Sequence, residues 1–256
     1  MSISLASLSR TKASRPPIIV IHGGPGLGKT TFAASAPGAV FVRTEDGLGH
    51  IEADAFPLAQ SFADVLDALR ALYAEQNTFR WVVIDSLSAL EPLIWQAVAA
   101  REGKSSIEDL GFGKGYVMAL DYWRQLFDAL HSLAAERGIG SILIAHSDVV
   151  RFESPEVEGY DRAQIKLHKR AFQLAYERAD VIGYAAPRVF VRKEQDGQRS
   201  RNLGVGSGER LLHLVERPAY IAKNRYSLPE SIPLSWPAFE AALLAAVAPN
   251  PASQAA

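Results

Sequence analysis

The sequence contains no cysteine and no long apolar run, and both absences narrow the possible functions. Without cysteine the chain forms no disulfide, offers no thiol nucleophile and builds no thiolate zinc site. No apolar stretch approaches the roughly 18 residues that a membrane-spanning helix needs. The basic N-terminus holds Arg10, Lys12 and Arg15 but lacks the apolar centre of a signal peptide. We therefore expect a cytoplasmic protein with no membrane contact.

Charge is nearly balanced overall, at −1, but it is unevenly distributed. Residues 1–30 carry four basic residues and no acidic one, and residues 188–225 carry nine Lys or Arg against four Asp or Glu. Such local excess favours a surface that faces a polyanion. A solvated hairpin with scattered charges is an equally good explanation.

Buried strands alternate with helices along most of the chain. Continuous apolar runs predict strands at 18–21, 39–42, 81–84, 141–145 and near 180–185. Apolar periodicity and end signals predict helices at 29–36, 61–76, 90–101, 116–137, 167–178 and 236–247. The fold class is therefore α/β, with a mainly parallel central sheet flanked by helices.

Antiparallel strands are expected only at the C-terminal edge of this sheet. Gln195-Asp196-Gly197 predicts a hairpin between flanking strands, and 211–222 reads as a further strand. The segments 102–115 and 147–165 are expected to be loops. No internal repeat is evident.

A glycine-rich segment joins the first predicted strand to the first predicted helix. It comprises Gly23, Gly24, Pro25, Gly26, Leu27, Gly28, Lys29, Thr30 and Thr31. The pattern G-x4-G-K-T in this context is a P-loop, whose glycines let backbone N–H groups surround a β-phosphate without Cβ clashes. Lys29 is expected to neutralise the β- and γ-phosphate oxygens, and the Thr30 hydroxyl to ligate Mg²⁺. The predicted ligands are therefore ATP and Mg²⁺.

Polar residues at the ends of other strands complete the expected site. Asp85 ends an apolar strand and would hold Mg²⁺ through a water. The alternative is that this aspartate only stabilises the turn after the strand, as is common. Glu45 is the candidate for orienting the attacking water, with Asp46 as the fallback and a simple turn acid as the alternative. His146 would sense the γ-phosphate or be an ordinary loop residue. The other histidines lack metal-binding spacing.

Taken together, these segments resemble the RecA-like ATPase core, and especially the compact phage-encoded RecA-like proteins of single-strand annealing and recombination. Gly-Pro-Gly-Leu-Gly-Lys-Thr resembles their Walker A motif, and Val-Val-Ile-Asp85-Ser86 resembles their Walker B segment. Phe-Val-Arg-Thr-Glu45 is similar to the strand that presents the catalytic glutamate, and Ile-Leu-Ile-Ala-His146 to the strand before the polar sensor. The resemblance covers about residues 18–234.

The segment Tyr-Ile-Ala-Lys223-Asn-Arg225-Tyr is similar to the Lys-Asn-Arg segment of RadA-type relatives. This implies a ring or filament in which Lys223 and Arg225 reach the nucleotide of the neighbouring protomer. A basic edge strand is the alternative. In contrast to these relatives, we expect neither a zinc-finger or Lon-like domain nor a separate N-terminal polymerisation domain. We expect a flexible basic arm at 1–16, a RecA-like ATPase domain at 17–247 and a disordered tail at 248–256.

The same resemblance implies two loops, 102–115 and 147–170, that contact single-stranded DNA. Their basic and aromatic residues are the candidates for phosphate contacts and base stacking: Lys104, Phe112, Lys114, Arg151, Phe152, Arg162, Lys166, Lys169 and Arg170. Both loops also contain acids, so each of these residues has a solvated loop position as its alternative.

The leading hypothesis is a DNA-stimulated ATPase that binds single-stranded DNA and promotes annealing or homologous recombination. The resemblance places it in a bacterial host cytoplasm if phage-encoded, with a single-strand-binding protein as a candidate partner. A nucleotide-switched replication or repair accessory protein without strand-exchange activity is a second hypothesis. A small-molecule kinase is a third, although no arginine-rich lid is evident.

Overall fold

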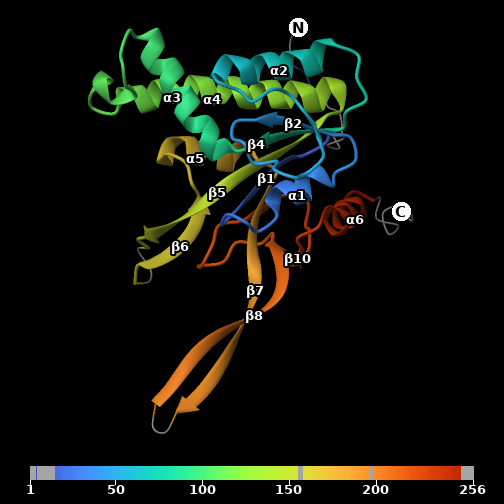
Figure 1. Ribbon diagram of the computed structural model, residues 1–256, viewed down its shortest axis with the longest axis vertical. Coiled ribbons are helices and arrows are strands. Elements are labelled where there is room, and N and C mark those ends of the chain that lie inside the picture. The colour runs from blue at the N-terminus through green and yellow to red at the C-terminus, as the bar shows by residue number, and fades with distance from the viewer. Residues whose placement is uncertain (1–3, 5–14, 155–157, 197–198, 249–256) are drawn as a thin grey trace.

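The computed structural model describes residues 4, 15–154, 158–196 and 199–248 (Figure 1). The predicted arm at 1–16 and tail at 248–256 lie almost wholly outside these residues. Among the described residues, no helix has both the length and the apolar character required to cross a bilayer.

A central sheet organises the domain, with strand order β10-β8-β7-β1-β5-β4-β2-β3. In chain order its strands are β1 (Ile18–Gly23), β2 (Ala39–Arg43), β3 (Asp54–Ala55), β4 (Trp81–Asp85), β5 (Gly140–Phe152), β7 (Val181–Asp196), β8 (Arg199–His213) and β10 (Ser231–Pro233). The strands from β7 to β3 are paired in parallel, whereas β8 and β10 are added antiparallel. The predicted fold class is confirmed.

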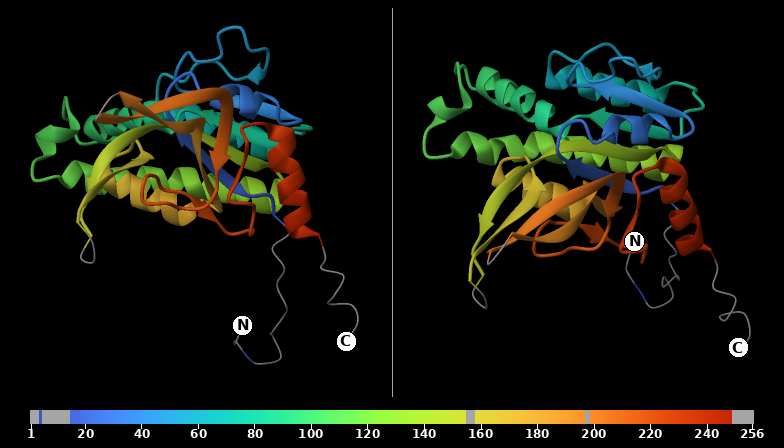
Figure 2. Two further views of the ribbon diagram at one scale, coloured as in Figure 1. Left: turned by 90° about the horizontal axis from the view of Figure 1, so that it is seen from below. Right: turned by 60° about the horizontal axis from the view of Figure 1, so that its bottom comes forward.

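Helices cover both faces of the sheet (Figures 1 and 2). One face carries α2 (Phe62–Ala74), α3 (Leu87–Arg101), α4 (Lys114–Ser132) and α5 (Lys169–Arg178), and the other carries α1 (Lys29–Ala34) and α6 (Trp236–Val247). Short helical turns lie at η2 (Ile107–Leu110) and η3 (Leu133–Arg137). Because side chains alternate along a strand, Val20 enters one core and Ile21 the other, both fully buried. This burial on both faces explains the continuous apolar run in β1.

Two predictions at the edges of the fold are wrong. The expected loop at 147–165 is largely a hairpin, since β5 continues to Phe152 and pairs antiparallel with β6 (Tyr160–Ile165). This ribbon is partly exposed, with Val149 72% exposed, so it lacks the apolar run of a core strand. The expected strand at 211–222 ends at His213 and is followed by bridges and the two-residue β9 (Lys223–Asn224).

The predicted hairpin of β7 and β8 is confirmed, with strand pairs from Tyr184↔His213 to Asp196↔Arg199. Its ladder shifts register between Pro187 and Val189, and beyond this point the hairpin extends away from the body of the domain (Figure 1). Because β5 and β7 both run parallel to β1, both hairpins leave the carboxyl edge of the sheet. The P-loop segment follows β1 at that same edge.

Helix α6 supplies a test of the packing. Phe239 is fully buried against the rings of Phe32 and Trp236, whereas Leu244 on the same helix is 62% exposed. We expect Phe239→Ala to lower the free energy of unfolding by about 3–5 kcal/mol, and Leu244→Ala to change it by less than about 0.5 kcal/mol. Urea titration of both variants measures the difference. Equal losses would contradict the placement of α6.

Candidate functional site

The glycine-rich turn between β1 and α1 requires glycine at defined positions. A Cβ on Gly23 would lie 2.5 Å from the carbonyl oxygen of Ala185 in β7, so only glycine fits between these strands. Gly28 precedes α1 with φ of 89°, in the left-handed region that disfavours other residues. The turn borders a cavity of about 570 Å³ that side chains from four other segments also line.

Lys29 points back onto this turn. Its side chain is buried, and Nζ donates to the carbonyl oxygens of Gly23 at 2.9 Å and Gly24 at 2.7 Å. Burial lowers the pKa of Lys29, and the carboxylates of Asp85 and Glu45 oppose that change. A cation held by neutral carbonyls can turn toward phosphate oxygens, which form stronger charge-assisted hydrogen bonds.

Asp85 and Thr30 meet across the cavity. The register Asp85↔Ile144 between β4 and β5 sets the carboxylate at the carboxyl edge of the sheet. Thr30 Oγ1 donates to Asp85 Oδ2 at 2.8 Å. Burial raises the pKa of Asp85, whereas the hydrogen bond from Thr30 lowers it. The structure therefore brings together the two residues predicted to bind the metal.

The donor set fits Mg²⁺ that arrives with a nucleotide. Among the described residues, no group of three or more His, Cys, Asp or Glu side chains is placed to hold a metal ion alone. Mg²⁺ is usually bound by one or two carboxylates together with substrate phosphates and waters. The hydroxyl of Thr30 and the carboxylate of Asp85 supply such a partial set of oxygen ligands.

Glu45 is positioned by the residue before it. Thr44 Oγ1 donates to the carbonyl oxygen of Ser86 at 2.7 Å and accepts from the Ser86 N–H at 2.8 Å. The backbone N–H groups of Thr44 and Glu45 both donate to the carbonyl oxygen of Asp85. These bonds fasten the end of β2 to the end of β4, so Glu45 lines the cavity. The fallback candidate, Asp46, has a side chain that is 84% exposed and does not line it.

His146 faces Glu45 from β5. Its Nε2 lies 3.4 Å from Glu45 Oε1, and strand pairing sets His146 beside Gly23. The His146 N–H donates to Ser88 Oγ, and the same hydroxyl donates to the carbonyl oxygen of Lys166, each at 3.0 Å. The start of α3 therefore connects the cavity wall to the end of the β5–β6 hairpin.

His22 is a buried polar residue that the sequence analysis missed. Nδ1 lies 2.8 Å from Ser147 Oγ, and Nε2 lies 3.0 Å from the carbonyl oxygen of Ile221. Burial lowers the pKa of His22 to about 4. A histidine in an otherwise apolar strand, directly before the P-loop, was the available signal.

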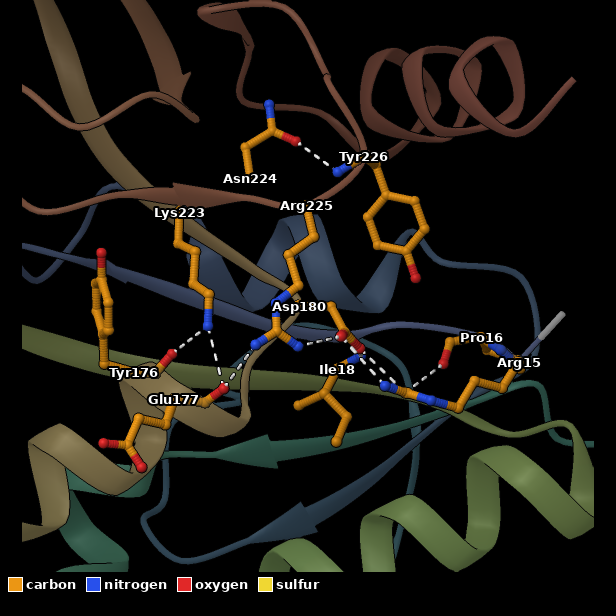
Figure 3. Close-up of polar contacts among 10 residues, drawn as sticks. All are labelled: Arg15, Pro16, Ile18, Tyr176, Glu177, Asp180, Lys223, Asn224, Arg225 and Tyr226. Atoms are coloured by element: carbon orange, nitrogen blue, oxygen red, sulfur yellow. Dashed lines mark hydrogen bonds and ion pairs between the residues drawn. The ribbon is translucent and has the colours of Figure 1, made fainter. Parts of the chain in front are cut away.

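Lys223 and Arg225 do not line the cavity of their own chain, and Figure 3 shows them beside the end of α5 and Asp180. Lys223 Nζ donates to the carbonyl oxygens of Tyr176 at 2.6 Å and Glu177 at 3.1 Å, at the end of α5. Arg225 donates to Glu177 O at 3.1 Å and to the Asp180 carboxylate at 3.2 Å. Strand pairing sets Lys223 opposite Ile182, and the Arg225 N–H donates to the carbonyl oxygen of Asp180. The two residues therefore lie roughly 10 and 16 Å of strand before the P-loop. Their action in trans stays a prediction.

Asp180 is the centre of this second polar cluster (Figure 3). Its side chain is only 5% exposed. It pairs with Arg15 at 3.0 Å, pairs with Arg225 at 3.2 Å and accepts from the Ile18 N–H at 3.0 Å. The cluster joins the beginnings of β1 and β7 to the end of β9.

The residue that follows the first predicted DNA-contacting segment, Tyr116, contacts the second segment at His168. The ring of Tyr116 stacks on that of His168, with centroids 4.3 Å apart and planes at 10°. Phe112 is fully exposed, with φ of 47° between two glycines. The exposed basic candidates in these segments are Lys104, Lys114, Arg151, Lys166, Lys169 and Arg170.

Two candidates on the β5–β6 hairpin contact each other. The Arg162 guanidinium lies 4.1 Å from the ring centroid of Phe152 and pairs with Glu216 at 3.2 Å. Arg151 lies 3.7 Å from Asp161. Much of the positive charge on this hairpin is therefore paired within the chain.

The cavity also contains residues with no recognisable motif. Gly47, His50 and Ile51 come from the loop after Glu45. Arg210 comes from β8, and its Nη1 donates to the carbonyl oxygen of Leu27 at 3.1 Å.

A protein family described as an AAA domain matches residues 15–226. The match includes every residue described above as lining the cavity. Comparison with curated proteins finds no match.

His22 leads to a prediction about pH. Since the unfolded histidine takes up a proton below about pH 6.5 and the folded one only near pH 4, stability falls as the pH is lowered through that window. Between pH 7 and 5 the loss due to His22 is about 2 kcal/mol. We expect urea titrations to show that His22→Gln loses about 2 kcal/mol less unfolding free energy between pH 7 and 5 than the wild type does. The control His50→Gln, at an exposed histidine, should lose as much as the wild type. If the free energy of unfolding of His22→Gln depended on pH as strongly as that of the wild type, His22 would not be the source of this pH dependence.

Proposed function

The chain belongs to the AAA domain family of P-loop NTPases, and from this premise we propose that it binds and hydrolyses ATP with Mg²⁺. One observation carries the proposal: P-loop residues, a paired hydroxyl and carboxylate, and a second carboxylate converge on one cavity from separate strand ends. We propose further that the free energy of ATP hydrolysis drives a RecA-like function, in which the protein binds single-stranded DNA and promotes annealing or homologous recombination.

The polar residues of the predicted motifs have roles that are consistent with their contacts in the cavity. Lys29 and the backbone N–H groups of the turn bind the phosphates, and Thr30 with Asp85 would hold Mg²⁺. The bound Mg²⁺ would neutralise charge on the phosphate oxygens. Glu45 orients the attacking water as its general base. His146, 3.4 Å away, positions the Glu45 carboxylate.

Single-stranded DNA is the partner that the exposed loops support. Phe112 is exposed and raised on a glycine-flanked turn, as a residue that stacks on a base would be. Lysines and arginines around the Tyr116–His168 contact offer charge for phosphates. The link from His146 through Ser88 to Lys166 joins this surface to the cavity. Stimulation of ATP hydrolysis by DNA would use that link.

Self-association is the remaining part of the proposal. Lys223 and Arg225 donate to the end of α5 and to Asp180 and do not line the P-loop cavity of their own chain, so a role at a nucleotide would require a neighbouring protomer. A ring or filament supplies that neighbour.

Nucleotide chemistry is tested by two variants and a control. We expect Lys29→Ala to weaken MgATP binding about 100-fold, because it removes a buried charge-assisted donor. Glu45→Gln keeps the affinity and slows phosphate release by about 10²–10⁴-fold, the usual contribution of a general base. Asp46→Asn, at the exposed neighbouring carboxylate, leaves both unchanged. Calorimetric titration and a phosphate-release assay make the measurements. Normal hydrolysis by Glu45→Gln would refute the assigned base.

The DNA partner is tested at Phe112. We expect fluorescence anisotropy to show that Phe112→Ala weakens binding to a single-stranded oligonucleotide about tenfold, the loss of one stacked base. Val117→Ala removes an exposed apolar residue on nearby α4 and leaves affinity unchanged. Single-stranded DNA should also accelerate phosphate release by the wild type. Absence of both binding and stimulation would favour a nucleotide-switched accessory protein instead.

A further inference from the structure

Arg210 occupies the place where the β7–β8 hairpin leaves the sheet. It is paired with Pro187, next to the register shift. Its backbone carbonyl accepts a hydrogen bond from the N–H of Leu234, which fixes the main chain there. The side chain is exposed and extends to the P-loop.

The guanidinium lies against the turn that would surround the phosphates. Nη1 donates to Leu27 O at 3.1 Å and would be only 2.8 Å from a Cβ on Gly28. A guanidinium has five N–H donors in a planar fork that matches phosphate oxygens. Within the described residues, Arg210 forms this one hydrogen bond and no ion pair, so most of its N–H donors have no partner there, and the residue lines the cavity.

The charges around the cavity show why a second cation matters. Apart from histidines, the charged side chains that line it are the acids Glu45 and Asp85 and the bases Lys29 and Arg210. Without Arg210, two carboxylates would face a single cation, Lys29, in a cavity that is proposed to bind a polyanion. Such an excess repels phosphate groups.

We propose that Arg210 binds the phosphates of the nucleotide in the same chain, as a second cation beside Lys29. This rests on the proposed nucleotide-binding function. The guanidinium needs only a small movement from Leu27 O to reach phosphate oxygens at the turn. Because Arg210 belongs to β8, the hairpin itself then contributes a residue to the nucleotide site.

The test separates contact with phosphate from support of the turn. Arg210→Gln keeps a shorter, neutral N–H donor but removes the charge, Arg210→Lys keeps the charge without the fork, and Arg210→Ala removes both. Arg188→Ala is the matched control, since Arg188 lies on the partner strand and pairs with Glu209 at 2.8 Å outside the cavity lining. Calorimetric titration with MgATP measures affinity, and thermal unfolding without nucleotide checks the fold of each variant.

We expect Arg210→Ala and Arg210→Gln each to weaken MgATP binding about tenfold or more, the loss of one charge-assisted hydrogen bond. Arg210→Lys should lose less, and Arg188→Ala should match the wild type. Wild-type affinity in Arg210→Gln would overturn the proposal, by showing that MgATP binding does not need the charge of Arg210. Wild-type affinity in Arg210→Ala would overturn it outright. If the wild type itself fails to bind MgATP, the proposed function fails first.

Discussion

The insertion of β5 between β1 and β4 is the constraint on which the rest of the site depends. The pairs Gly23↔His146 and Asp85↔Ile144 align three strand ends at one edge of the sheet. A slip of one residue would turn every side chain of a strand to the opposite face. Since all three strands are buried on both faces, such a slip would disrupt both cores, and the register that forms the cores also forms the cavity.

Buried hydrogen bonds between the strand ends fix the loops around the cavity, in addition to the strand register. Thr44 and Ser86 exchange two hydrogen bonds between the ends of β2 and β4, and Ser88 joins α3 to β5. His22 joins β1 to the start of the β5 extension at Ser147. Unpaired polar groups are costly in a buried environment, so these partners strongly favour one arrangement of the loops around the cavity. Glu45 is therefore held at the cavity by the contacts of its neighbours.

Local sequence signals predicted the parts of the site that are contiguous or follow a strand. The P-loop turn is one continuous segment, and Asp85 and His146 come directly after apolar runs, so strand ends alone placed them at one edge. The β5–β6 ribbon was missed because its exposed residues, such as Val149, form no core pattern. Arg210 was missed because it lies 183 residues from its contact, Leu27, on an antiparallel strand with no motif. Only tertiary structure connects such residues.

The contacts of Asp180 also determine how much free energy it would cost to release Arg225 toward a neighbouring protomer. Breaking a buried ion pair usually costs several kcal/mol because one charge is left uncompensated. Asp180 differs, since Arg15 and the Ile18 N–H remain bound to it when Arg225 is removed. Arg225 is itself half exposed, so its release returns a guanidinium mainly to water. The cost of release is therefore small compared with that of an isolated buried pair. Intramolecular pairing at the amino edge and a role in trans are thus physically compatible.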